Sequence, residues 1–192
     1  MSTLVAPHVH LWTRNEYHQM AELGWFARQR VELIEGQVID MSPMGSEHAT
    51  AVALTAKAIE QVFGTGYFVR WQMPFGVGEL SEPEPDVAVI AGDIRDYTAE
   101  HPTSAVLIVE VADTSLVYDR TEKASLYAKA GVTDYWVLNL VDRQLEMYRH
   151  AIPASEAPYG FRYANATVLT AEEHVTPLVL QHASIAIADL LP

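Results

Sequence analysis

The sequence contains no cysteine, which excludes disulfide bonds, thiolate zinc sites and cysteine nucleophiles. This absence suits a reducing compartment, and we expect a cytoplasmic protein. A long apolar run is also missing, since the longest apolar strand-like stretch, Ala105–Val109, is far too short to cross a bilayer. The N-terminus has no basic region followed by a long apolar stretch, so we predict neither a secretory signal nor a membrane partner.

Positive charge is scarce: 12 lysines and arginines face 25 acidic residues, and the net charge is −13. Affinity for nucleic-acid phosphates comes largely from lysine and arginine, so this balance opposes simple nucleic-acid binding. It does not exclude a local site, because salt screens charges beyond about 8 Å. A metal ion or a partner chain also inverts the local field. The simplest role of the excess acid is solubility.

The composition supports one folded domain. Hydrophobic residues make up 49% of the 192-residue chain and charged residues 19%, which is enough material for a single core. We therefore predict a tail over 1–12 and a single domain over 13–192. Neither a phosphate-binding glycine-lysine loop nor a serine nucleophile elbow occurs.

The hydrophobic pattern predicts an α/β fold with a central mixed β-sheet, helices packed on it and additional antiparallel strands. The stretch "VELIEGQVIDM" is typical of a hairpin that turns at Glu35-Gly36. We expect helices over 13–26, 46–63, with Ser46 as its N-cap, and 121–130. Central strands are expected over 67–73, 86–90, 105–111 and 134–140, before further strands near the C-terminus.

Two carboxylates stand at the ends of two of these strands. Asp86 follows the acidic, proline-rich stretch "SEPEP", and Glu110 ends the apolar run of "AVLIVEVAD". If the two strands pair antiparallel with Asp86 opposite Glu110, the same register places Ala88 opposite Ile108. Both carboxylates then project from the same face, close enough to share one hard divalent cation. Without a cation, the two anions would repel each other.

A lysine follows in the next predicted helix. In "YDRTEKASLYAKAG", Lys123 and Tyr127 share one face at helical spacing. Beside a metal site, this lysine could orient the attacking water and stabilise negative charge on a phosphate. The alternative is that Lys123 or Arg120 makes only a rim ion pair with Glu110, Asp113 or Asp119.

The aromatic residues favour packing over base stacking. Tyr127, Tyr135, Trp136 and Tyr148 are expected in the core or in a dimer contact. The stretch "DYWVLNL" over 134–140 is predicted to be a sheet strand with an aromatic edge and is a candidate for pairing or self-association, and we expect a homodimer.

Together these residues resemble a known family. The order of "YHQMAELGWF", "VELIEGQVIDMSPMGSEH", "PEPDVAVI" and "LIVEVADTSLVYDRTEKASLYAKAGVTDYWVLNL", with "ASIAIADLL" at the end, is similar to the Uma-type restriction-endonuclease-like family. That family belongs to the PD-(D/E)xK nuclease superfamily, and the resemblance spans about 14–191. It implies the restriction-endonuclease-like fold.

The resemblance also assigns roles to single residues. It makes Pro85-Asp86 the "PD" element and Glu110 the acidic residue of the "(D/E)xK" element. The superfamily lysine would stand at Ala112, and the resemblance implies that Lys123 replaces it from the following helix. Glu32 matches an acidic residue near the metal.

One further position, His48, matches a recurring histidine of the family without a settled role. The resemblance therefore implies a nuclease in which Asp86, Glu110 and a backbone carbonyl near Val111 hold Mg²⁺ or Mn²⁺. Lys123 and Glu32 would assist the hydrolysis of DNA.

Two other functions stay open. The net negative charge and Ala112 favour a binding module that keeps the fold, hydrolyses little or nothing, and engages nucleic acid or protein as a homodimer. Hydrolysis of a smaller phosphoester has weaker support.

Overall fold

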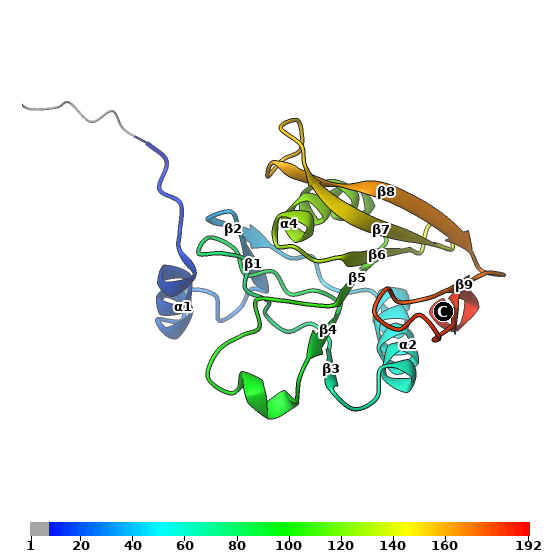
Figure 1. The fold of residues 1–192 in the computed structure, drawn as a ribbon. Helices are drawn as coiled ribbons and strands as arrows, with labels where there is room; N and C mark the ends of the chain where they lie inside the picture. The colour runs from blue at the N-terminus through cyan, green and yellow to red at the C-terminus, as the bar shows by residue number, and fades with distance from the viewer. Residues whose placement is uncertain (1–7) are drawn as a thin grey trace, which may run out of the picture.

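The computed structural model describes residues 8–192 and centres on a six-stranded sheet in the order β3-β4-β5-β6-β7-β8 (Figure 1). Only β5 and β6 are parallel, and every other neighbouring pair is antiparallel. The strands are β3 Tyr67–Arg70, β4 Val87–Ala91, β5 Leu107–Ala112, β6 Asp134–Asn139, β7 Gln144–Pro153 and β8 Phe161–Thr170. Two small hairpins accompany the sheet, formed by β1 Val31–Ile34 with β2 Gln37–Asp40 and by β9 His174–Val175 with β10 Ile185–Ala186.

The helices lie at three places along the chain. They are α1 Arg14–Glu22, α2 Ser46–Val62 and a helical crossover between β5 and β6 made of α3 Leu116–Tyr118, a π-helical turn Asp119–Lys123 and α4 Ala124–Lys129. Short 3-10 turns cover Ile94–Tyr97 and Ile187–Asp189. Residues 1–7 of the predicted tail lie outside the described residues. Among residues 8–192, no helix combines the length and the apolar composition that crossing a bilayer requires.

The two faces of the sheet are covered by different helices. Because side chains alternate along a strand, Val87 and Val89 pack in one core with α2 and the C-terminal segment. Ala88 and Ile90 pack in the other core with α4. The central strand β5 is buried over all six residues, so both of its faces are covered by the rest of the fold. The mixed sheet with helices on both faces is the predicted fold class.

The register of β4 and β5 agrees with the prediction. They pair antiparallel with Val87 opposite Val109 and Ala88 opposite Ile108. The pairing thus brings Asp86, directly before β4, next to Glu110 near the end of β5. A slip by one residue would turn the side chains of one strand to the opposite face, and Asp86 and Glu110 would then no longer meet.

Two helix starts differ from the prediction. Ser46 is the first residue of α2 rather than its cap; Gly45 occupies the cap position and supplies no side-chain hydrogen bond. The crossover helix begins at Leu116 rather than Thr121. Its early turns are stabilised by tertiary contacts, because the Asp119 carbonyl accepts a hydrogen bond from the Tyr135 hydroxyl at 2.8 Å.

The stretch 134–140 forms a sheet strand, as predicted, but this strand is not a site of self-association. β6 lies between β5 and β7, and all six of its residues are buried. Both edges of the strand are used by neighbouring strands, and Tyr135 and Trp136 are core residues with no exposed surface. β6 is therefore not available for pairing with a second chain.

The turn between β1 and β2 requires glycine for two reasons. Gly36 has a φ of +77°, in the left-handed region, and a Cβ built there would lie 2.5 Å from the Leu11 Cβ. The backbone of the preceding segment is held on this turn, since the Trp12 amide donates to the Gly36 carbonyl at 2.9 Å.

We predict that Gly36→Ala destabilises the protein more than Gly66→Ala. Gly66 also has a positive φ, +94°, but a Cβ there meets no atom within 4 Å. Gly66→Ala should therefore lose only the backbone term of about 1–2 kcal/mol, and Gly36→Ala should lose at least about 1 kcal/mol more from the clash. Urea unfolding of both variants measures the difference. Equal losses would show that the contact with Leu11 does not constrain the turn.

Arg120, whose alternative partners in the sequence analysis were Glu110, Asp113 and Asp119, pairs instead with Glu146 on β7. Its Nε donates to Glu146 Oε2 at 2.8 Å, and its Nη2 also contacts this carboxylate. Tyr148 and Asn139 donate to the same group. Burial by itself raises the pKa of Glu146, but these hydrogen bonds outweigh it and lower the pKa to about 2.

This depressed pKa predicts a pH-dependent contribution to stability. Because the folded-state pKa lies below the usual value of 4.5, ionised Glu146 stabilises the fold above that pH, and the stabilisation is lost as the pH falls toward about 2. The difference in unfolding free energy between the wild type and Glu146→Gln should therefore shrink over this window. Glu156→Gln, at a side chain 72% exposed, should show no such trend. A pH-independent Glu146→Gln effect would contradict the assignment.

Candidate active site

An acidic cleft of about 310 Å³ opens at the ends of β4 and β5. Its walls come from four parts of the chain: the β1–β2 hairpin with the loop after it, the start of α2, the strand ends, and the crossover helix. The residues that sequence reasoning singled out all line it, namely Glu32, His48, Asp86, Glu110, Val111 and Lys123.

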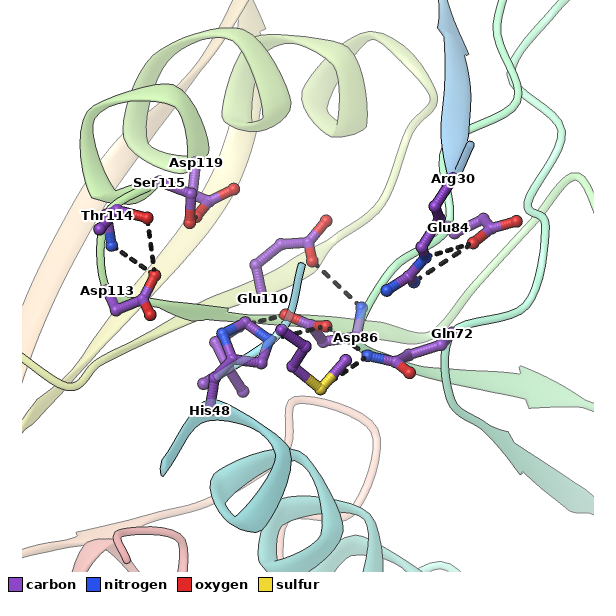
Figure 2. A network of polar contacts seen from close by, with 12 residues as sticks. Arg30, His48, Gln72, Glu84, Asp86, Glu110, Asp113, Thr114, Ser115 and Asp119 are labelled. Atoms are coloured by element: carbon purple, nitrogen blue, oxygen red, sulfur yellow. Dashed lines mark hydrogen bonds and ion pairs between the residues drawn. The ribbon is translucent and has the colours of Figure 1, made fainter. Parts of the chain in front are cut away.

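Asp86 lies at the centre of the polar network (Figure 2). Its Oδ2 accepts a hydrogen bond from the Val111 amide at 2.9 Å. Its Oδ1 lies 3.2 Å from His48 Nε2 and 3.3 Å from Gln72 Nε2. Neighbours from α2, from the segment after β3 and from β5 therefore fix the orientation of this carboxylate.

Glu110 is the buried counterpart of Asp86. Its Oε2 accepts a hydrogen bond from the Asp86 amide at 3.1 Å. Its Oε1 accepts the Tyr127 hydroxyl at 2.6 Å and the Lys123 ammonium at 3.3 Å. The crossover helix thus reaches Glu110 with two side chains that lie one helical turn apart on the same face.

Lys123 connects two carboxylates from distant parts of the sequence. Its Nζ lies 2.7 Å from Glu32 Oε2 and 3.3 Å from Glu110 Oε1, and its side chain is only 3% exposed. Glu32 is itself held in place because its Oε1 accepts the Glu84 amide at 2.8 Å. The ion pair expected at an exposed rim is therefore buried inside the cleft.

Negative charge exceeds positive charge in the cleft. Two permanent cations, Arg30 and Lys123, line it together with seven carboxylates: Glu32, Asp40, Glu84, Asp86, Glu110, Asp113 and Asp119. Burial raises the pKa of Asp119 to about 6 and also raises the pKa of Glu110, and neighbouring carboxylates add to both shifts. The cleft thus favours the binding of positive charge.

Neighbouring carboxylates raise the pKa values of both His48 and Lys123. Burial lowers the pKa of His48, but the hydrogen bond and charge of Asp86 outweigh it and raise the pKa overall. Burial also acts to lower the pKa of Lys123, and the carboxylates of Glu110 and Glu32 reverse this effect. Lys123 is therefore a permanently charged ammonium.

The donor chemistry fits a hard divalent cation. Asp86 and Glu110 supply carboxylate oxygens to the lining of the cleft, and the surplus of acid is not balanced by side-chain cations. Within residues 8–192, no three histidine or acidic side chains already form a ligand cluster. A site with two carboxylates completed by water and backbone oxygen is the arrangement that Mg²⁺ commonly uses.

Sequence reasoning missed one member of the network. Gln72 follows β3 with a φ of +52°, and this left-handed backbone ends the strand before the predicted 73 and turns the amide toward Asp86 (Figure 2). Such backbone strain in a non-glycine residue is common at functional sites. No local sequence signal marks this position. Tyr127 was expected only as a packing residue, yet its hydroxyl contacts Glu110.

A larger hollow of about 800 Å³ lies elsewhere, between the start of α1 and residues 97–103. Beside it, the buried carboxylate of Glu82 is already bound by Arg14 Nε at 2.8 Å and His18 Nε2 at 2.6 Å. The acid there is neutralised within the protein, unlike that of the cleft.

The fold and the cleft define the class of protein: a restriction-endonuclease-like α/β domain with an acidic site where two central strands end. A family model described as "Putative restriction endonuclease", Uma2, matches residues 14–188. The chain belongs to this family, and both the resemblance and the fold predicted from it are confirmed.

A solved structure described as a "putative nuclease belonging to DUF820" from Anabaena variabilis shares the fold. It is 16% identical, with a TM-score of 0.64 over 84% of this chain and 89% of that chain. A search of curated proteins gives no match.

The buried ammonium predicts a large stability difference between two lysines of one helical segment. Lys123→Met leaves Glu32 and Glu110 buried without their cation, which should cost about 3–5 kcal/mol of unfolding free energy near neutral pH. Lys129→Met removes a partly exposed pair with Glu35 and should cost at most about 1 kcal/mol. Chemical denaturation compares the two variants. Similar losses would show that Lys123 does not stabilise the carboxylate cluster.

Proposed function

We propose that the protein is a metal-dependent nuclease that hydrolyses phosphodiester bonds of DNA. The observation that supports this most directly is the meeting of Asp86 and Glu110 with Lys123 in one acidic cleft. Membership of a family described as restriction endonucleases supports the same reaction class.

Asp86, Glu110 and the backbone carbonyl of Val111 would hold Mg²⁺ or Mn²⁺. When bound, the ion polarises a phosphate oxygen and makes water a better nucleophile. The hydrogen bonds from the Val111 and Asp86 amides to the two carboxylates keep these ligands oriented before any ion arrives.

Lys123 and Glu32 would act beside this site. The Lys123 ammonium opposes the burial that raises the pKa of Glu110, and it offers positive charge where negative charge grows on the phosphate. Glu32 holds that ammonium in place at 2.7 Å. Water would attack phosphorus in line with the leaving oxygen, whose bond to phosphorus breaks as the new bond forms.

The acidic cleft also explains why substrate binding would depend on the ion. A phosphodiester approaching seven carboxylates and two cations is repelled unless added positive charge reverses the local field. Positive charge near the rim would attract a phosphate, since Arg28 and Arg30 line a hollow beside the cleft. Arg30 is itself paired with Glu84 at 3.2 Å.

One observation favours a binding module on the same fold as the second candidate. Lys123 is buried, and its ammonium already has two carboxylate partners, while Ala112 occupies the usual lysine position. A lysine committed in this way stabilises the structure without necessarily reaching a substrate.

The nuclease proposal predicts that conservative changes in the cleft abolish cleavage. Purified protein would be incubated with supercoiled, linear, single-stranded and branched DNA in Mg²⁺ or Mn²⁺. Asp86→Asn and Lys123→Gln should each lower the cleavage rate by about 100-fold or more, because the first removes a carboxylate ligand of the ion and the second removes positive charge that stabilises the transition state. Asp93→Asn, at a carboxylate 64% exposed, should cleave as the wild type does.

Calorimetric titration with Mn²⁺ separates the two candidates. The wild type and Asp93→Asn should bind the ion with equal affinity, and Asp86→Asn should bind it more weakly. Mn²⁺ binding by a wild type that cleaves none of the DNA forms would favour the binding module, and cleavage that persists in Asp86→Asn would refute the assigned site.

A further inference from the structure

The two edges of the central sheet differ sharply. One edge, β3, is only four residues long and ends at Arg70, followed by the left-handed Gln72. The other edge, β8, is ten residues long and runs along the outside of the sheet (Figure 1, orange). Short strands and backbone irregularities protect a sheet edge from pairing with other chains, and β8 has neither.

The sequence of β8, "FRYANATVLT", also lacks chemical protection. It contains no lysine, no acidic residue and no proline, and its single charge is Arg162 near the start. Its pairing with β7 keeps one register from Phe161 to Thr170, so no bulge in β8 turns the edge away. Natural proteins commonly protect an edge strand with charged residues, proline or a bulge.

Backbone groups at the two ends of β8 form hydrogen bonds with residues outside β7, but those in the middle of the strand do not. The Phe161 carbonyl accepts the Ser125 hydroxyl at 2.7 Å, and the Thr170 amide donates to Glu173 Oε2 at 2.7 Å. Between them, the backbone of residues 164–169 has no hydrogen bond within the described chain except to β7. In an antiparallel strand, alternate residues direct their N–H and C=O groups away from the paired neighbour.

We propose that β8 pairs with β8 of a second copy of this chain, antiparallel about a two-fold axis, to give a continuous twelve-stranded sheet. The pairing satisfies the outward backbone groups of both strands with one self-complementary surface. A second copy is the occupant because the segment is nearly uncharged on a chain of net charge −13. Two such chains meet with least repulsion at a neutral strand.

Exposed side chains agree with this interface. Residues 164–168 are all exposed, and Val168 has 53% of its surface accessible. The side chains are small or uncharged and allow two backbones to approach to strand spacing. Because the contact consists mainly of six residues from each copy, it is smaller than a standard stable interface, and we expect dissociation constants of roughly micromolar order.

Sedimentation velocity across the micromolar range tests the association. The wild type should pass from monomer to dimer as its concentration rises. Val168→Lys places a charge on the edge and should weaken association at least about tenfold. Val141→Lys is the matched control, since Val141 is 66% exposed in the turn between β6 and β7, and it should associate as the wild type does. A monomeric wild type, or equal effects of both substitutions, would overturn the proposal.

Cysteine scanning tests the geometry, and the absence of native cysteine makes it unambiguous. Each of residues 164–169 would be replaced singly by cysteine and oxidised. Two-fold pairing brings only the position nearest the axis within the roughly 4.4–6.8 Å between Cα atoms that a disulfide needs. The yield of crosslinked dimer should therefore peak at one or two adjacent positions and fall on either side. Uniform crosslinking, or a dimer without any crosslink, would contradict the two-fold β8 interface.

Discussion

The structure of the cleft depends on one buried ammonium group. Burying carboxylates is costly unless a cation accompanies them, and Lys123 is the cation within contact of both Glu32 and Glu110. These three side chains come from the β1–β2 hairpin, the central sheet and the crossover helix. The interaction therefore holds together three of the four parts of the chain that form the walls of the site, and it leaves a surplus of negative charge in the cleft.

Much of this arrangement could be predicted from the sequence because strand pairing is a strong constraint. The antiparallel register that sets Ala88 opposite Ile108 also places Asp86 beside Glu110. The helical spacing of Lys123 and Tyr127 likewise predicts that both lie on one face of the crossover helix. Periodicity and burial are local properties that a single sequence displays.

The remaining features depend on contacts between distant segments. No sequence feature around Gln72 predicts its left-handed backbone or the hydrogen bond from its side-chain amide to Asp86. The aromatic pattern over 134–140 is equally consistent with an edge strand and with an interior strand. Only the pairing of β7 on its far side decides between them. The early start of the crossover helix depends on the Tyr135 hydroxyl, which bonds to the Asp119 carbonyl from across the core.

The cation beside Glu110 comes from a helix and not from the strand that carries Glu110. Ala112 lies on β5 with no exposed surface, packed in the core beside α4. The positive charge reaches Glu110 from the crossover helix, through the side chain of Lys123. Ala112 can therefore contribute to core packing, and the position of the cation depends on how the crossover helix packs on the sheet.

Because the site needs the crossover helix in place, the site forms only late in folding. Glu32 and Lys123 are far apart in the sequence, and the parallel pairing of β5 with β6 forms only when the whole crossover has closed. Parallel pairing of strands that are distant in the sequence is slow compared with the formation of local contacts. A nascent or partly melted chain would therefore carry scattered acidic residues rather than an assembled centre, and completion of the fold would itself act as the safeguard on its chemistry.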